Sequence, residues 1–103
     1  MSKLTINKTK EGEKLTAEII GRVDVMTAPQ FDSGITDELD GITEVVLNLK
    51  QLEYMSSAGL RVLVGLQKTM LAKKGSLTVC YPSAAILDIF TATGLTDFLK
   101  IVD

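Results

Sequence analysis

Two adjacent hydroxyl side chains, Ser56 and Ser57, occur where an apolar stretch ends and a helical pattern begins. They lie in the segment EYMSSAGLRVLVGLQ. A serine that acts as a nucleophile needs a neighbouring base, which is most often histidine. The chain contains no histidine, and this junction has no serine-x-x-lysine spacing that could replace it. We therefore expect a protein that is not an enzyme, and the two hydroxyls need another explanation.

A serine directly before an apolar-periodic helix is commonly its N-cap, and it stabilises the helix by about 1 kcal/mol. One cap needs only one hydroxyl, so the other serine is free for a second role. The small residues Ala58 and Gly59 leave the first amides of the helix accessible to an anion. A phosphate carried by one of the serines would be stabilised there and would add about −1.5 to −2 charges to the surface. The two serines are therefore compatible with both a structural cap and a phosphorylation site.

Composition limits the remaining classes of function. The 103 residues carry a net charge of −2, so no strongly basic surface for nucleic acid is expected. No apolar run approaches the roughly 18 residues of a membrane span, and the N-terminus lacks the apolar region of a secretion signal. The single cysteine, Cys80, cannot form an internal disulfide and is interpreted as a small buried thiol. We predict a cytoplasmic protein without membrane insertion, direct nucleic-acid binding, metal or cofactor.

The elements that position the two serines follow from the spacing of apolar residues. Residues 3–20 alternate apolar and polar positions on both sides of a turn at Gly12, which predicts a β-hairpin. A first helix is expected from Thr27, whose spacing to Gln30 matches a capping box, to a stop at Gly41.

Two apolar runs, residues 43–50 and 76–81, predict strands that are covered on both faces. Between them, residues 58–74 have the pattern of a mostly buried helix, and Gly75 is expected to end it in the left-handed conformation. A third helix is predicted from 82 to 94, and the chain ends in a short strand. Together these elements predict one α/β domain over residues 1–103, with a mixed, mostly parallel sheet, an N-terminal hairpin and helices packed on it.

Parallel strands place their following loops at one end of the sheet. If the second and third strands are parallel, the loops at 21–28 and 52–59 leave the sheet at its carboxyl end, where such folds usually bind ligands. Asp24 and Ser57 are then expected to be neighbours. Three apolar residues in these loops are expected to be exposed beside them: Val25, Met26 and Met55.

The segment LNLKQLEYMSSAGLRVLVGL resembles the signature of STAS domains of the anti-sigma factor antagonist family. That signature is an apolar strand, a short loop, and Asp-Ser-Ser/Thr-Gly-Leu at the start of a helix. GRVDVMTAPQF is similar to the family's Gly-x-x-Asp-x-x-x-Ala segment, and LTATGLTDFLKI is similar to its closing helix and strand. The resemblance covers the whole chain and implies a STAS-like sandwich.

The resemblance also implies a phosphorylation site. In the family, the serine two positions before the glycine is phosphorylated by a partner that is both an anti-sigma factor and a serine kinase, and that position is Ser57. The sequence departs from the motif because Ser56 replaces the usual Asp, Ala58 replaces Ser or Thr, and Asn48 replaces an Asp of the strand. Without the neighbouring Asp to orient the hydroxyl of Ser57, Ser56 is kept as the alternative acceptor. The partner-binding surface is expected to comprise Asp24, Val25, Met26, Met55, Ser56, Ser57, Ala58, Gly59 and Arg61.

Two functions are compatible with these residues. The leading hypothesis is an anti-sigma factor antagonist, which binds an anti-sigma factor with serine kinase activity and releases a sigma factor. Phosphorylation of Ser57 switches it off, and a phosphatase resets it. The alternative is a constitutive accessory subunit of a transporter or other signalling complex. Nucleotide or small-ligand binding is disfavoured, because EGEK and KKGS lack the spacing and context of a phosphate-binding loop.

Overall fold

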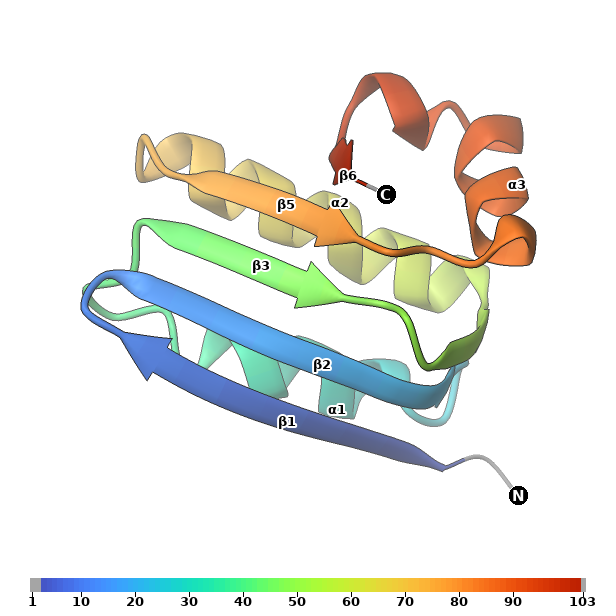
Figure 1. The fold of residues 1–103 in the computed structure, drawn as a ribbon, viewed down its shortest axis with the longest axis horizontal. Coiled ribbons are helices and arrows are strands. Elements are labelled where there is room, and N and C mark those ends of the chain that lie inside the picture. Colours follow the sequence, from blue (N-terminus) through green and yellow to red (C-terminus); the bar gives the residue numbers. More distant parts are fainter. Residues whose placement is uncertain (1–2, 103) are drawn as a thin grey trace.

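A β-hairpin forms one edge of the sheet (Figure 1). The computed structural model describes residues 3–102. Strand β1 (Leu4–Glu11) pairs antiparallel with β2 (Lys14–Val23) through a turn in which Gly12 has a φ of +61°. The predicted hairpin is confirmed. Alternate residues of β2 point to the same face of the sheet, and this face carries the buried side chains Leu15, Ala17, Ile19 and Val23.

The other strands are β3 (Glu44–Asn48), β4 (Leu52–Met55), β5 (Ser76–Cys80) and β6 (Lys100–Val102). Each pairs in parallel with its neighbour, in the order β1-β2-β3-β5-β6, so the predicted mixed, mostly parallel sheet is confirmed. Strand β4 lies outside this order. It pairs with the second half of β2, beyond the part of β2 that pairs with β3. We expected these residues to be a loop.

Helices α1 and α2 cover the same face of the sheet. Helix α1 (Ala28–Thr36) and helix α2 (Ser57–Ala72) lie together behind the strands in Figure 1. Right-handed crossovers that step from β2 to β3 and on to β5 in one direction must pass over the same face. The core forms between this face and the helices, where the largest buried side chains include Phe31, Ile35, Leu47, Leu63, Leu66 and Met70.

The opposite face of the sheet is only partly shielded. Along β3, the residues Glu44, Val46 and Asn48 are half-buried, and Cys80 of β5 is half-buried on the same side. The expectation of burial on both faces was therefore wrong for β3, and so was a fully buried Cys80, whereas in β5 the consecutive residues Leu77, Thr78 and Val79 are all buried. The apolar runs result from β-branched and apolar residues on the partly shielded side, which hide the alternation in the sequence.

The chain closes with helix α3 (Ala84–Ala92), the short 3₁₀ helix η1 (Leu95–Asp97) and β6. The hydroxyl of Ser83 accepts a hydrogen bond from the backbone N–H of Ile86, so the predicted start of this helix is confirmed. Phe98, which directly follows η1, is tied to α2, because the side-chain amide of Gln67 donates to its carbonyl oxygen at 2.9 Å.

Two predicted helix ends differ from the observed ones. Helix α1 ends at Thr36, before Gly41, although Leu39 beyond it is still buried. After α2, the left-handed residue is Lys74, with a φ of +60°, and not Gly75. Glycine is required at 75 for a different reason, because a Cβ there would collide with the carbonyl oxygen of Thr43. That oxygen accepts a hydrogen bond from the N–H of Ser76 at 2.9 Å and starts β5 in register.

Candidate partner-binding site

Pairing between β2 and β4 brings the two predicted loops together. Val23 is in register with Met55, and the N–H of Ser56 donates to the carbonyl oxygen of Val23 at 2.8 Å. The next residues of the two segments, Asp24 and Ser57, therefore leave the sheet at its carboxyl end, on the right of Figure 1. The expected juxtaposition arises, but through β4 and not through β3.

The two serines at this junction have different surroundings. Ser57 is exposed and is the first residue of α2. Ser56 is the N-cap residue in an extended conformation, yet its hydroxyl makes no capping hydrogen bond. Its Oγ is buried and has no hydrogen-bond partner in the described structure. The cap interpretation is therefore wrong for Ser56. The buried oxygen also disfavours Ser56 as the alternative phosphate acceptor, because a kinase needs an accessible oxygen.

Removing the Ser56 hydroxyl is expected not to lower the stability of the protein. A buried hydroxyl without a partner is unfavourable, so Ser56→Ala should leave the free energy of unfolding unchanged or raise it by up to about 1 kcal/mol. Urea unfolding followed by circular dichroism measures this change. The matched control is Ser83→Ala, which removes an observed N-cap bond and should cost about 1 kcal/mol. Equal losses in the two variants would show that Ser56 has a hydrogen-bond partner.

A network of hydrogen bonds shapes the loop between β2 and α1. The Oδ1 atom of Asp24 accepts from the backbone N–H groups of Met26 at 2.9 Å and Thr27 at 3.1 Å. The buried Thr27 hydroxyl donates to the carbonyl oxygen of Arg22 and accepts from the N–H of Asp24, both at 2.9 Å. The capping box expected between Thr27 and Gln30 does not form, because both side chains bond elsewhere: the Gln30 amide donates to the carbonyl oxygen of Leu4.

The Thr27 hydroxyl is expected to contribute strongly to this loop. Thr27→Val keeps the shape of the side chain but leaves the Asp24 N–H and the Arg22 carbonyl without this partner. We expect the free energy of unfolding to fall by about 1–3 kcal/mol, measured by urea unfolding. Thr27→Ser retains the hydroxyl, so its free energy of unfolding should fall clearly less than that of Thr27→Val. A valine variant as stable as the wild-type protein would contradict this role for the hydroxyl.

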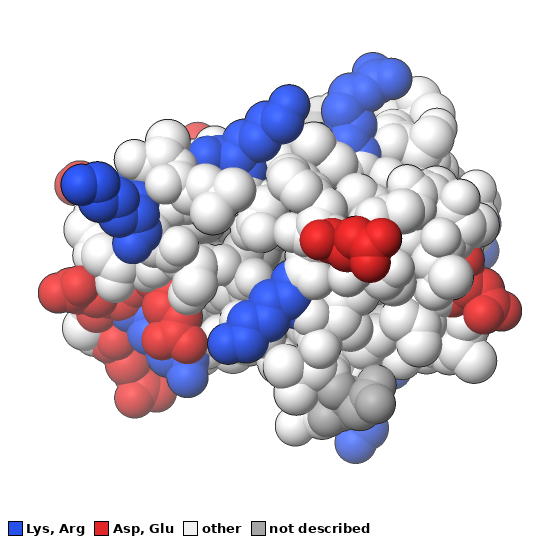
Figure 2. All heavy atoms as spheres, turned by 90° about the horizontal axis from the view of Figure 1, so that it is seen from above, with Lys and Arg blue, Asp and Glu red and all other residues white. Residues whose placement is uncertain are grey.

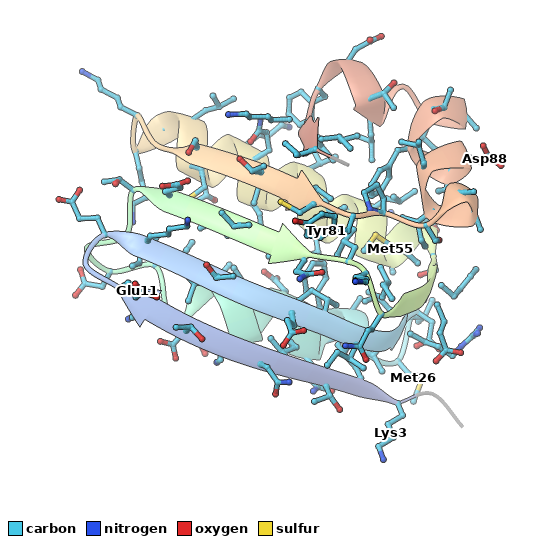
Figure 3. The ribbon with its side chains drawn as sticks, viewed as in Figure 1. Lys3, Glu11, Met26, Met55, Tyr81 and Asp88 are labelled. Atoms are coloured by element: carbon cyan, nitrogen blue, oxygen red, sulfur yellow. The ribbon has the colours of Figure 1, made fainter. Side chains whose placement is uncertain are left out.

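The loop presents two apolar side chains to solvent. Val25 is 72% exposed and Met26 is 80% exposed, as predicted. Met55 is only 1% exposed, so its predicted exposure was wrong. It is the last residue of β4 and its side chain points inward, whereas Met26 projects from the rim of the molecule (Figure 3). Gly59 is also buried, so neither Met55 nor Gly59 is offered directly to a partner.

An open hollow lies between the starts of α1 and α2. It has a volume of about 310 Å³ and is lined by Val25, Ala28, Pro29, Asp32, Ala58, Arg61 and Val62. The sequence predicted Val25, Ala58 and Arg61 as site residues but not Val62 or the three residues that α1 contributes. The periodicity of α1 identifies its buried side but not the neighbour that its exposed side faces.

Charged side chains are unevenly distributed over the surface. On the face drawn in Figure 2, acidic and basic side chains gather at the lower left, and the basic side chains along the top are surrounded by uncharged surface. The recorded ion pairs join Lys8 and Lys10 to Glu38, near the hairpin end of the sheet. The hydrogen bond from Lys10 and the charge of Lys8 lower the pKa of the Glu38 carboxyl. Arg22 lies over the ring of Tyr54, 4.7 Å from its centroid.

Metal ligands and membrane spans also bear on the type of site. No cluster of three or more His, Cys, Asp or Glu side chains within residues 3–102 is arranged to hold a metal ion. None of the helices described in this range has both the length and the apolar character needed to cross a membrane.

The fold and the exposed serine at the start of α2 define the class of protein. The STAS domain family model matches residues 5–103, and the chain therefore belongs to the STAS domain family. The anti-sigma-B factor antagonist of Staphylococcus aureus is 29% identical over 99 residues, which cover 95% of this chain and 92% of that protein. BtrV of Bordetella bronchiseptica is 31% identical over 102 residues, which cover 98% of this chain and 86% of BtrV.

Solved structures share the same architecture. An anti-sigma factor antagonist from Mycobacterium paratuberculosis superposes with a TM-score of 0.87 at 21% identity, covering 97% of this chain and 86% of that one. Unphosphorylated SpoIIAA, an anti-sigma factor antagonist, gives a TM-score of 0.82 at 18% identity, covering 98% and 89%. SpoIIAA from Bacillus in its phosphorylated form superposes with a TM-score of 0.74 at 18% identity, covering 98% of this chain and 92% of that one. These likenesses confirm the predicted fold class.

Proposed function

We propose that this chain is an anti-sigma factor antagonist that binds an anti-sigma factor through the surface around Ser57 and so releases a sigma factor. The observation that carries the proposal is the exposure of Ser57 at the first residue of α2, beside the projecting Val25 and Met26. The relative from Staphylococcus aureus is named as an antagonist of this kind, which supports the class. The chain acts by binding and not by catalysis, and it works in the cytoplasm.

Affinity for the partner comes mainly from the two exposed apolar side chains. Burying a valine or methionine side chain contributes about 1.5–3 kcal/mol, and Val25 and Met26 start almost fully exposed. The loop that carries them is held by the Asp24 and Thr27 hydrogen bonds, so little conformational entropy is lost on binding. Asp24 therefore acts chiefly by shaping this surface.

Phosphorylation of Ser57 switches the protein off. The Ser57 side chain is accessible to a kinase, whereas the Oγ of Ser56 is not. The modification adds about −1.5 to −2 charges at the centre of the binding surface. The kinase is the anti-sigma factor itself, and a phosphatase restores the active form. SpoIIAA, which shares the fold, is described in a phosphorylated form, and this supports the same regulation here.

Phosphosite mapping tests the proposal. The full chain is incubated with ATP and the anti-sigma-type serine kinase encoded beside its gene, and modified residues are located by mass spectrometry. We expect one phosphate on Ser57, the same result for Ser56→Ala, and no phosphate on Ser57→Ala. Modification of a different residue would contradict the proposal. No modification by a kinase that hydrolyses ATP would contradict it as well.

A further inference from the structure

Arg61 is an exposed cation one helical turn beyond Ser57. Side chains four residues apart on an α-helix lie on the same face, with about 5–6 Å between their Cβ atoms. Helix α2 is continuous from Ser57 to Ala72, so this spacing holds for the pair. Within residues 3–102, the recorded ion pairs involve only lysines and Glu38, and the Arg61 guanidinium takes part in none of them.

We propose that Arg61 is the intramolecular counter-ion of a phosphate on Ser57. This inference deepens the proposed function and rests on its assignment of Ser57 as the modified residue. The planar guanidinium offers paired N–H donors that match two oxygens of a phosphate monoester. An anion N-terminal to a cation at this spacing is also the favourable order in a helix, because it agrees with the helix dipole.

Other charged groups near the junction are less suited to this role. Lys68 is exposed on the same helix but lies about 16 Å along the axis from Ser57. Arg22 is stacked on Tyr54. Asp32 lines the same hollow as Arg61, yet no ion pair is recorded between them. Arg61 is therefore both within reach of Ser57 and uncommitted in the unmodified protein.

Pairing has a direct consequence for the binding surface. The phosphate introduces negative charge, and it also withdraws the one positive charge that α2 presents next to Ser57. An acidic side chain of the partner that contacts Arg61 in the unmodified protein would lose its counter-ion at the same time. One phosphorylation would thus alter two contacts with the partner, the one at Ser57 and the one at Arg61.

The test uses the full chain with phosphoserine installed at position 57 during translation, so that no kinase is needed. Phosphorus NMR then gives the pKa of the second ionisation of the phosphate. We expect this pKa to be about 0.2–0.4 pH unit lower in the Arg61-containing protein than in its Arg61→Gln variant. The difference should shrink when the salt concentration is raised from 0.05 M to 0.5 M.

Two variants make the comparison specific. Lys68→Gln removes the same charge from the same helix and should leave the phosphate pKa unchanged, while Arg61→Lys should retain part of the effect. Circular dichroism verifies that each variant is folded. Equal pKa values in the wild-type protein and Arg61→Gln would overturn the pairing, and so would an equal effect of Lys68→Gln.

This test is independent of the kinase experiment. A kinase that leaves Ser57 unmodified would contradict the proposed function, while the NMR result would still decide whether Arg61 pairs with a phosphate at this position. Conversely, unchanged phosphate ionisation in Arg61→Gln would remove the pairing and leave the proposed function standing.

Discussion

Gly59→Ala is expected to lower the free energy of unfolding by about 1–3 kcal/mol. A Cβ added to Gly59 would lie 2.6 Å from Cγ1 of Val23 and 2.7 Å from Cγ of Met55. Both neighbours are buried in the core and have little room to move. The steric cost therefore exceeds the gain of about 1 kcal/mol that alanine normally brings to a helix.

Gly65→Ala is the matched control, because it makes the same substitution in the same helix. Nothing lies within 4 Å of a Cβ at position 65, and the residue is exposed. We expect this variant to be more stable than the wild-type protein by up to about 1 kcal/mol. Urea unfolding of both variants gives the comparison. Stabilisation by both substitutions would mean that α2 does not approach β2 and β4 as closely as described.

The second large effect concerns charge at position 57. Under the proposed function, Ser57→Asp should weaken binding to the anti-sigma factor by up to roughly a thousandfold. A close pair of like charges at a partly exposed interface costs on the order of 4 kcal/mol at an effective dielectric constant near 20, which corresponds to that change in affinity. Ser57→Ala should bind like the wild-type protein, because it adds no charge. Isothermal titration calorimetry with the purified partner measures each affinity.

Ser57→Asn separates charge from size. Asparagine has nearly the shape of aspartate but is neutral, so it should bind far more tightly than the Asp variant if electrostatic repulsion is the cause. The gap between the two variants should narrow at high salt. Equal affinities of Ser57→Asn and Ser57→Asp would count against a charge-based switch.

Much of the architecture could be predicted from local patterns. The hairpin follows from the alternation at 4–6 and 15–19 on the two sides of the turn at Gly12, and the third helix from Ser83 directly before an apolar repeat. Strand β4 could not be predicted in this way. Its four residues have buried positions only at the two ends, Leu52 and Met55, so no alternation is visible. Its existence depends on β2 being long enough to pair with two strands in succession.

The candidate site was predictable only in part. Ser57, Val25 and Met26 are exposed as expected, since they belong to segments that leave the sheet at its carboxyl end. The burial of the Ser56 hydroxyl could not be foreseen, because it depends on how close α2 lies to the sheet. The share of the hollow that α1 contributes depends in turn on how α1 and α2 are placed relative to each other.

The bond from the Ser56 N–H to the Val23 carbonyl ties the start of α2 to the end of β2, and Asp24 and Thr27 lock the adjoining loop. A surface anchored in this way needs no refolding before a partner can bind to it. Under the proposed function, the delay between phosphorylation of Ser57 and release of the partner would then be set by how fast the bound partner dissociates. Partner dissociation would then limit the rate of the response, because this chain itself undergoes no slow rearrangement.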